Sequence, residues 1–213
     1  MPYFHTDAVQ AVNYLDCNVN KLGVDLMTLS SHKIYGPKGV GALFIRKGTP
    51  ISPLIHGGGQ EFGIRSGTEN VAGIVGFGEA IFQISSPQVQ KTKYKIQKLR
   101  DRLIDGVLKI IPEARLNGSK DRRLPNNANF LFPGVDSQTL LIALDQEGIA
   151  VSSGSACSMR TIEPSHVLIA LGLSPKEARS SLRVTLGRYT TQKEIDTFLK
   201  ILPRVIKRIK IIS

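Results

Sequence analysis

The chain has 213 residues, of which 41% are hydrophobic and 21% charged, a composition that indicates a folded globular protein and excludes a disordered one. No apolar run reaches the roughly 18 residues of a membrane span, and the start MPYFHTD lacks the features of a secretion signal, so we expect a cytoplasmic protein without membrane contact. The 28 lysines and arginines outnumber the 17 acidic residues. Many of these basic residues lie in two amphipathic stretches, 91–111 and 193–213, where no aromatic residues alternate with the charges to form a stacking platform. This pattern favours solvated helix faces over a nucleic-acid surface.

Three short apolar runs with turn signals after them open the chain, at residues 3–7, 24–30 and 41–47, and we interpret them as strands. The intervening residues 8–23 are long enough for a crossover, which predicts that the first two strands run parallel. The carboxyl ends of parallel strands meet at one edge of a sheet, where ligands bind. We therefore expect Asp7 and the segment Ser30–Lys33 to lie together at that edge.

The rest of the chain predicts a second domain. Residues 68–111 have mostly helical periodicity with an interruption at 85–88, where we place the boundary between domains 1–87 and 88–213. The second domain is expected to contain strands at 127–134, 149–153 and 180–187, a helix at 137–148 and a closing basic helix at 193–213. Ser137 is the predicted N-cap of the first of these helices, and Gly148 its stop signal. The fold class is therefore α/β, with an α+β second domain.

The stretch SSHKIYGPKG (30–39) contains a candidate reactive lysine, Lys33. A lysine that reacts covalently must lose its proton, which partial burial, a neighbouring cation such as His32 and a rigid Gly/Pro turn all favour. Taken alone, a lysine in such a turn is usually a solvated loop residue. Asp7 adds weight, because a carboxylate on the adjacent strand is the group that keeps the ring nitrogen of pyridoxal phosphate protonated. Asp7 fits a helix N-cap equally well.

Three further stretches contain candidate functional residues. The glycine-rich loop HGGGQEFGIRSGTEN (56–70), with Arg65 and Thr68, suits a phosphate, although it matches neither a P-loop nor GxGxxG. In SSGSACSMRTIEPSH (152–166), small residues around Cys157 favour a reactive thiol on a surface loop over a buried structural cysteine, whereas Cys17 lies in a polar turn and is interpreted as incidental. Arg183, in SSLRVTLGR, is either an ordinary surface arginine or a bidentate partner for a substrate carboxylate.

Together these ordered motifs strongly resemble the cysteine desulfurases, which are pyridoxal-phosphate enzymes of the aspartate aminotransferase fold. The residues from Cys157 to Glu163 resemble the group with the longer cysteine loop, which serves iron-sulfur cluster assembly. The resemblance covers nearly the whole chain. It implies part of the large domain, a small α+β C-terminal domain and a homodimer. It also implies L-cysteine as the substrate and a sulfur-acceptor or iron-sulfur scaffold protein as a partner.

The resemblance implies a role for each candidate residue and no metal ligands. Lys33 carries the cofactor covalently and removes the α-proton of the substrate, and Cys157 attacks the substrate sulfur and keeps it as a persulfide after alanine leaves. The other implied contacts are Asp7 to the pyridinium nitrogen, Gln10 to the phenolic oxygen, Ser30 and His32 to the phosphate, Thr68 to the phosphate of the neighbouring subunit, and Arg183 to the substrate carboxylate.

One departure from the family concerns the start of the chain. The family segment that corresponds to Met1 falls near the middle of the protein, so the first half of the cofactor domain has no counterpart here, and His5, His56 and His166 do not replace its ring-stacking histidine. We therefore expect a truncated reading frame, or one piece of a split enzyme that an N-terminal fragment completes. The competing interpretation is a non-catalytic fragment that docks sulfur-acceptor proteins. Selenocysteine is as compatible with the motifs as cysteine.

Overall fold

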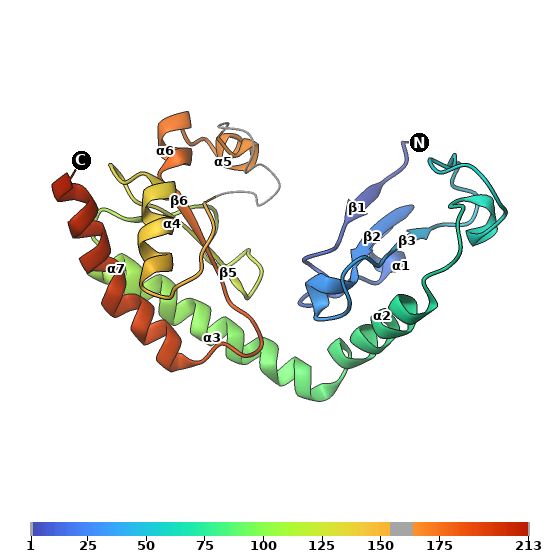
Figure 1. Cartoon of the computed structure of the whole chain (residues 1–213), viewed down its shortest axis with the longest axis horizontal. Coiled ribbons are helices and arrows are strands. Elements are labelled where there is room, and N and C mark those ends of the chain that lie inside the picture. The colour runs from blue at the N-terminus through green and yellow to red at the C-terminus, as the bar shows by residue number, and fades with distance from the viewer. Residues whose placement is uncertain (1, 154–163, 213) are drawn as a thin grey trace. The chain divides into compact units, whose positions relative to one another are not determined.

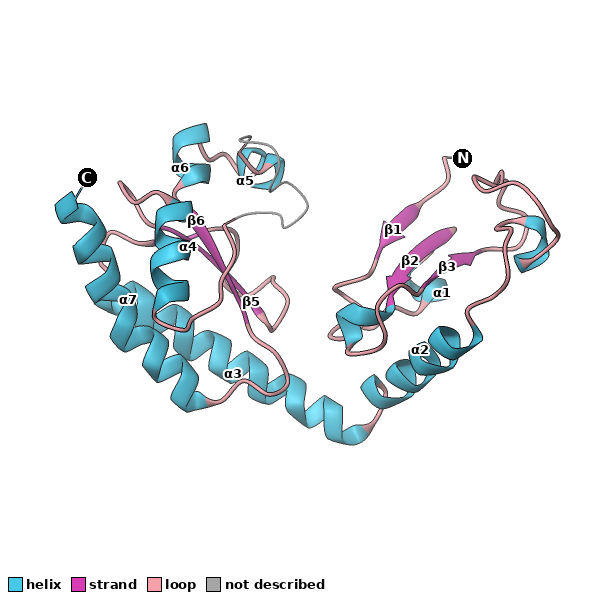
Figure 2. Ribbon diagram, in the orientation of Figure 1, coloured by secondary structure: helices cyan, strands magenta, loops and turns pink. Residues whose placement is uncertain are grey.

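The computed structural model describes residues 2–153 and 164–212. The chain divides into two compact units, Met1–Lys91 and Thr92–Ser213, and each contains a three-stranded sheet (Figure 1, Figure 2). Helix α3 (Pro87–Ile110) runs through this division, so the predicted domain boundary after residue 87 stays a prediction. Within the described ranges, no helix combines the length and the apolar composition that a membrane span requires.

The sheet of the first unit has the strand order β1 (His5–Asp7), β2 (Leu26–Ser30) and β3 (Gly41–Ile45). β1 is parallel to β2, which confirms the prediction, and β3 is antiparallel to β2. The crossover from β1 to β2 consists of turns followed by the four-residue helix α1 (Val19–Leu22). Asn18 caps this helix through its side chain, and Gly23 ends it in the left-handed conformation, with φ of 66°, which a residue without a Cβ adopts at no steric cost.

Two small apolar clusters hold the first unit together. One contains Ile34, from the 3-10 helix η1 (Ser31–Ile34), and three residues of α2 (Val71–Ile84), namely Phe77, Ala80 and Ile84. The other contains Ala8, Val24 and Met27, with Cys17 packed against it. Leu29 of β2 packs against both clusters. The sheet, η1 and α2 therefore form one layered unit.

The second unit has an antiparallel sheet in the order β4 (Arg115–Leu116), β5 (Asn127–Leu131) and β6 (Ser181–Thr185). Its other helices are α4 (Ser137–Gln146), α5 (His166–Ala170), α6 (Pro175–Arg179) and α7 (Gln192–Ile212). Its fully buried residues include several from α3, β5, α4, β6 and α7: Leu103, Ile104, Phe130, Leu140, Leu144, Leu182 and Leu202. The predicted amphipathic pattern of the closing helix is confirmed, since Ile195, Phe198, Leu202, Val205 and Ile206 recur at three- and four-residue spacing and are buried.

Two local predictions in the second unit are wrong, and one short strand was missed. Asp136, not Ser137, caps α4, because its Oδ1 accepts the backbone N–H of Thr139 at 2.8 Å while Ser137 is a buried first residue of the helix. The predicted strand 149–153 contributes only an isolated bridge from Ser152 to Arg183. The two-residue strand β4 was not predicted, since it is too short to show an alternating pattern.

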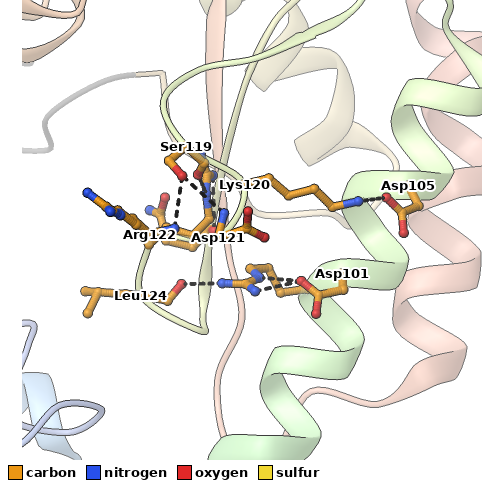
Figure 3. Close-up of polar contacts among 10 residues, drawn as sticks. Asp101, Asp105, Ser119, Lys120, Asp121, Arg122 and Leu124 are labelled. Carbon is orange, nitrogen blue, oxygen red and sulfur yellow. Dashed lines mark hydrogen bonds and ion pairs between the residues drawn. The ribbon is translucent and has the colours of Figure 1, made fainter.

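Polar contacts hold the turn between β4 and β5 against α3 (Figure 3). Ser119 Oγ accepts the backbone N–H groups of residues 121 and 122 at 3.2 and 3.0 Å, which closes the turn locally. Lys120 Nζ donates to Asp105 Oδ1 of α3 at 2.5 Å. Both side chains of this ion pair are exposed, so the pair should contribute little free energy to the contact between the turn and α3.

Candidate active site

The parallel strands of the first unit bring the two predicted parts of the site to one sheet edge. Asp7, the last residue of β1, lies in register with Thr28 of β2. β2 ends two residues later at Ser30, and η1 follows directly with His32 and Lys33. Gln10 lies three residues after Asp7, in the exposed turn that leaves the same edge. The order of the elements thus places Asp7 and Ser30–Lys33 at neighbouring strand ends.

Hydrogen bonds define the polar side chains of this edge. Ser30 Oγ and His32 Nδ1 are 3.0 Å apart, and His5 Nε2 lies 2.7 Å from Thr28 Oγ1. Asp7 Oδ1 accepts the backbone N–H of Val9 at 2.9 Å, and turns follow it instead of a helix. The helix N-cap interpretation of Asp7 is therefore wrong, and its carboxylate closes a turn at the end of the strand.

Lys33 is exposed, and no hydrogen bond or ion pair joins it to any other described residue. The partial burial expected of a reactive lysine is therefore absent in this unit. The turn around it is nevertheless rigid, because Ile34 is buried and Tyr35 adopts a left-handed conformation with φ of 70°. A Cβ on Gly36 would lie 2.2 Å from Ser31 Oγ and 3.0 Å from Ala80 Cβ of α2. This close approach fixes η1 against α2 and leaves the Lys33 side chain on the open side.

The glycine-rich loop is folded by its own side chains. Ser66 is buried and donates to the carbonyl of Gly58 at 2.8 Å, while Gln60 Oε1 accepts the N–H of Gly67 at 3.2 Å. Arg65 Nη1 donates to the carbonyl of Ser66 at 3.0 Å. Thr68 is exposed near the N-terminal end of α2, and no hydrogen bond joins it to the Ser30–Lys33 segment among the described residues. The loop therefore presents Thr68 outward.

The remaining candidates belong to the second unit. Arg183 is a half-buried residue of β6 whose Nη2 donates to Ser152 Oγ at 3.3 Å. It has no carboxylate partner among residues 2–153 and 164–212, which leaves most of its donors available for an anion. Cys157 lies outside the described residues.

Several polar residues near the candidates were missed by sequence reasoning. His5 and Thr28 join β1 to β2 next to Asp7, and Asn129 of β5 lies in register with Arg183. The segment NANFL contained a signal, because its alternation places Asn127 and Asn129 on the face opposite Ala128 and Phe130. Nothing in the sequence indicated that Ser152 would pair with Arg183.

Comparison with known proteins identifies the family. The model of the family "Aminotransferase class-V" matches residues 2–198. The chain belongs to this family. Membership implies pyridoxal phosphate as the cofactor, and it agrees with the α/β fold described above.

Individual relatives show more specifically which proteins this chain resembles. The chain is 52% identical over 211 residues to the cysteine desulfurase IscS of Dictyoglomus turgidum, and the match covers 99% of this chain and 53% of that relative. Among solved structures, a NifS-like protein from Rickettsia africae has a TM-score of 0.87 at 36% identity, over 96% of this chain and 54% of its own. The structure of SspA in complex with cysteine has a TM-score of 0.65 at 37% identity, over 89% and 51%. The predicted resemblance to cysteine desulfurases is confirmed, and the chain spans about half the length of these class-V relatives.

Proposed function

We propose that this chain carries the lysine, cofactor-binding and cysteine-loop part of a pyridoxal-phosphate-dependent cysteine desulfurase, which converts L-cysteine to L-alanine and retains the sulfur on Cys157. The observation that carries the proposal is the placement of Asp7 and Ser30–Lys33 at the ends of neighbouring parallel strands. It occurs in a chain that is 52% identical over 211 residues to an IscS-type desulfurase. The cysteine bound to the related SspA supports the choice of substrate.

The residues at the sheet edge fit the cofactor chemically. Asp7 offers a carboxylate, Ser30 and His32 offer a hydroxyl and an imidazole, and Lys33 offers an amine that no described residue engages. These are the groups that a pyridinium nitrogen, a phosphate and an aldehyde require, respectively. When bound, the cofactor supplies an electron sink for the bonds at the α-carbon of the substrate.

The proposed roles of the protein groups follow from their chemistry. Asp7 keeps a proton on the ring nitrogen, Gln10 donates to the phenolic oxygen, and Ser30 with His32 binds the phosphate. Lys33 Nζ takes the proton from the α-carbon of the substrate. The Cys157 thiolate forms a bond to the substrate sulfur as the carbon–sulfur bond breaks, and the carbon receives a proton to give alanine. Arg183 binds the carboxylate, which suits its half-buried guanidinium, since the one acceptor that it has among the described residues is the uncharged Ser152 hydroxyl.

The assembly around this chain is also proposed. Thr68, exposed before α2, would reach the phosphate of a neighbouring subunit in a homodimer. The sulfur would pass to an acceptor or iron-sulfur scaffold protein. The chain spans 53% of the length of its IscS relative, so this proposal concerns the part of the cofactor domain that the chain contains.

Cofactor trapping and alanine release test the proposal on the 213-residue chain. Borohydride reduction after incubation with pyridoxal phosphate should attach the cofactor to Lys33, and Lys33→Ala should abolish this. Lys38→Ala is the matched control, because Lys38 is exposed in the same turn, and it should label as the wild type does. Cys157→Ser should retain labelling but lose alanine release from L-cysteine. Equal labelling of Lys33→Ala and the wild type would contradict the proposal and favour a non-catalytic docking fragment.

A further inference from the structure

A row of polar side chains crosses the sheet of the second unit. Asn117 follows β4, and its backbone N–H donates to the carbonyl of Asn129 on β5 at 2.8 Å. Asn129 is in register with Arg183 on β6, and Arg183 pairs in turn with Ser152. Successive side chains of such a row share one face, since neighbouring residues across antiparallel strands point the same way. Arg183 therefore lies between Asn129 and Ser152.

The backbone fixes Ser152 opposite Arg183. The N–H of Ser152 donates to the carbonyl of Arg183 at 3.1 Å, and the N–H of Arg183 donates to the carbonyl of Ser152 at 2.7 Å. This reciprocal exchange is the hydrogen-bonded pair of an antiparallel ladder. The position of Ser152 is therefore set by its main chain, so its hydroxyl can be removed without removing the pairing.

The guanidinium of Arg183 has one acceptor among the described residues, and it is Ser152 Oγ, which Nη2 approaches at 3.3 Å. Asn129 on the other side makes no hydrogen bond to this guanidinium, and its Oδ1 accepts Asn117 Nδ2 at 2.7 Å. Asn117 Nδ2 also donates to Ser181 Oγ at 3.0 Å, which holds the Asn pair in this orientation. The Nδ2 donor of Asn129 is thus left beside the donors of Arg183.

We propose that Ser152 is a positioning residue for Arg183. Its hydroxyl accepts one of the two Nη2 hydrogens and so restrains the guanidinium plane, leaving the second Nη2 hydrogen, together with Nη1 or Nε beside it, to bind both oxygens of a carboxylate. The inference rests on the proposed function, in which Arg183 binds the carboxylate of L-cysteine. A long arginine side chain loses rotamer freedom when it binds, so a restraint already present in the free protein improves affinity for the substrate.

The pairing of Ser152 with Arg183 also links the arginine that binds the carboxylate to the chain segment that contains the reactive cysteine. Cys157 follows Ser152 by five residues, and Ser152 is held by two backbone bonds to the arginine. The same bridge therefore fixes both the arginine and the point from which the cysteine segment starts. Because these backbone bonds remain when the hydroxyl is removed, Ser152→Ala should change substrate affinity and leave the start of the cysteine segment in place.

The first test measures the restraint without any turnover. In the full chain, the side-chain Nε–H signal of Arg183 is assigned by its loss in Arg183→Lys, and its mobility is measured by ¹⁵N relaxation. Ser152→Ala should make Arg183 Nε as mobile as the exposed arginines, and Ser152→Thr, which restores a hydroxyl, should keep it restrained. Thr185→Ala is the matched control, since it removes a hydroxyl from the same face of β6. An unchanged Arg183 signal in Ser152→Ala overturns the proposal.

The second test uses steady-state alanine release with pyridoxal phosphate present. Ser152→Ala should raise KM for L-cysteine roughly three- to tenfold with kcat changed less than about twofold, and Ser152→Thr should restore KM. An unchanged KM, or a loss confined to kcat, overturns the positioning role. If the wild-type chain neither traps the cofactor on Lys33 nor releases alanine, the proposed function fails, while the relaxation result still decides whether Ser152 restrains Arg183.

Discussion

At the scale of single residues, Arg100 is the buried cation of the second unit. It is 4% exposed, and its guanidinium donates to Asp101 Oδ1 at 2.6 and 2.9 Å and to the carbonyl of Leu124 at 3.2 Å (Figure 3). Arg100→Met keeps the aliphatic volume but removes the bonds to Asp101 and one of the two donors to that carbonyl, which also accepts the backbone N–H of Asn127 at 3.2 Å, so unfolding should become easier by about 1–3 kcal/mol. Arg102→Met is the control, because its ion pair with Asp196 is exposed and should contribute less than about 1 kcal/mol. Urea denaturation of both variants measures the difference, and equal losses would contradict the assignment.

Glu177 gives a residue-scale prediction about pH. The backbone N–H and the hydroxyl of Ser174, and then Arg115, hydrogen-bond its carboxylate and lower its pKa from 4.5 to about 2. Because the folded-state pKa is below the unfolded one, the stabilisation is fully present above about pH 4.5 and is lost as the pH falls toward 2. Glu177→Gln should therefore be less stable than the wild type at pH 7, and the gap should close between pH 4.5 and 2. Thermal melts across this range check it, and a gap that is constant with pH would count against it.

At the scale of elements, the packing of α2 on the lysine turn depends on Gly76 of α2 as well as on Gly36 of the turn. A Cβ on Gly76 would lie 2.6 Å from Pro37 Cγ and 3.1 Å from Pro37 Cδ, whereas a Cβ on Gly78, two residues later, would meet nothing within 4 Å. Gly76→Ala should therefore destabilise the first unit by about 1–3 kcal/mol through overpacking against a rigid ring. Gly78→Ala should stabilise it by about 0.5–1 kcal/mol, since alanine is the better helix former. Circular dichroism melts of the two variants measure both changes in stability. A Gly76→Ala variant more stable than the wild type would show that the turn moves to make room for the added methyl group.

The elements that sequence predicted well are those with a long or unambiguous pattern. The parallel pairing of β1 and β2 followed from the length of the crossover, and the apolar face of α7 followed from its periodicity. Asp136 was missed as a cap because aspartate and serine stand side by side and both fit, so only the observed bond to Thr139 decides between them. The segment 149–153 has a strand-like composition, but a strand also needs a partner edge, and only Ser152 finds one.

The candidate site likewise contains residues whose positions the sequence indicated and others whose positions it did not. Asp7 and Lys33 were brought to one edge by topology, which the sequence indicated. Arg183 is in register with Asn129 and hydrogen-bonded to Ser152, which lie 54 and 31 positions away in the chain, so local patterns carry no information about these neighbours.

At the scale of the whole molecule, the two units differ in how much apolar surface they bury. Seven of the buried apolar residues of the described chain belong to the first unit and 26 to the second. The second unit combines three long helices and a sheet around that core, while the first has only its two small clusters. Since burial of apolar groups is the main favourable term in folding, the first unit should open at lower free energy than the second.

Hydrogen exchange tests this asymmetry and the cofactor site in one experiment. Amides of β1–β3 and α2 should exchange before those of β5, α4 and α7, because opening of the first unit exposes fewer buried groups. A ligand that binds only the folded state stabilises it by mass action, so pyridoxal phosphate should slow exchange in peptides that contain β2 and η1 and leave α7 unchanged. Lys33→Ala should weaken this protection, and pyridoxine, which lacks the aldehyde and the phosphate, should not produce it. Equal exchange of the two units would contradict the burial argument, and cofactor protection confined to α7 would move the binding site away from the sheet edge.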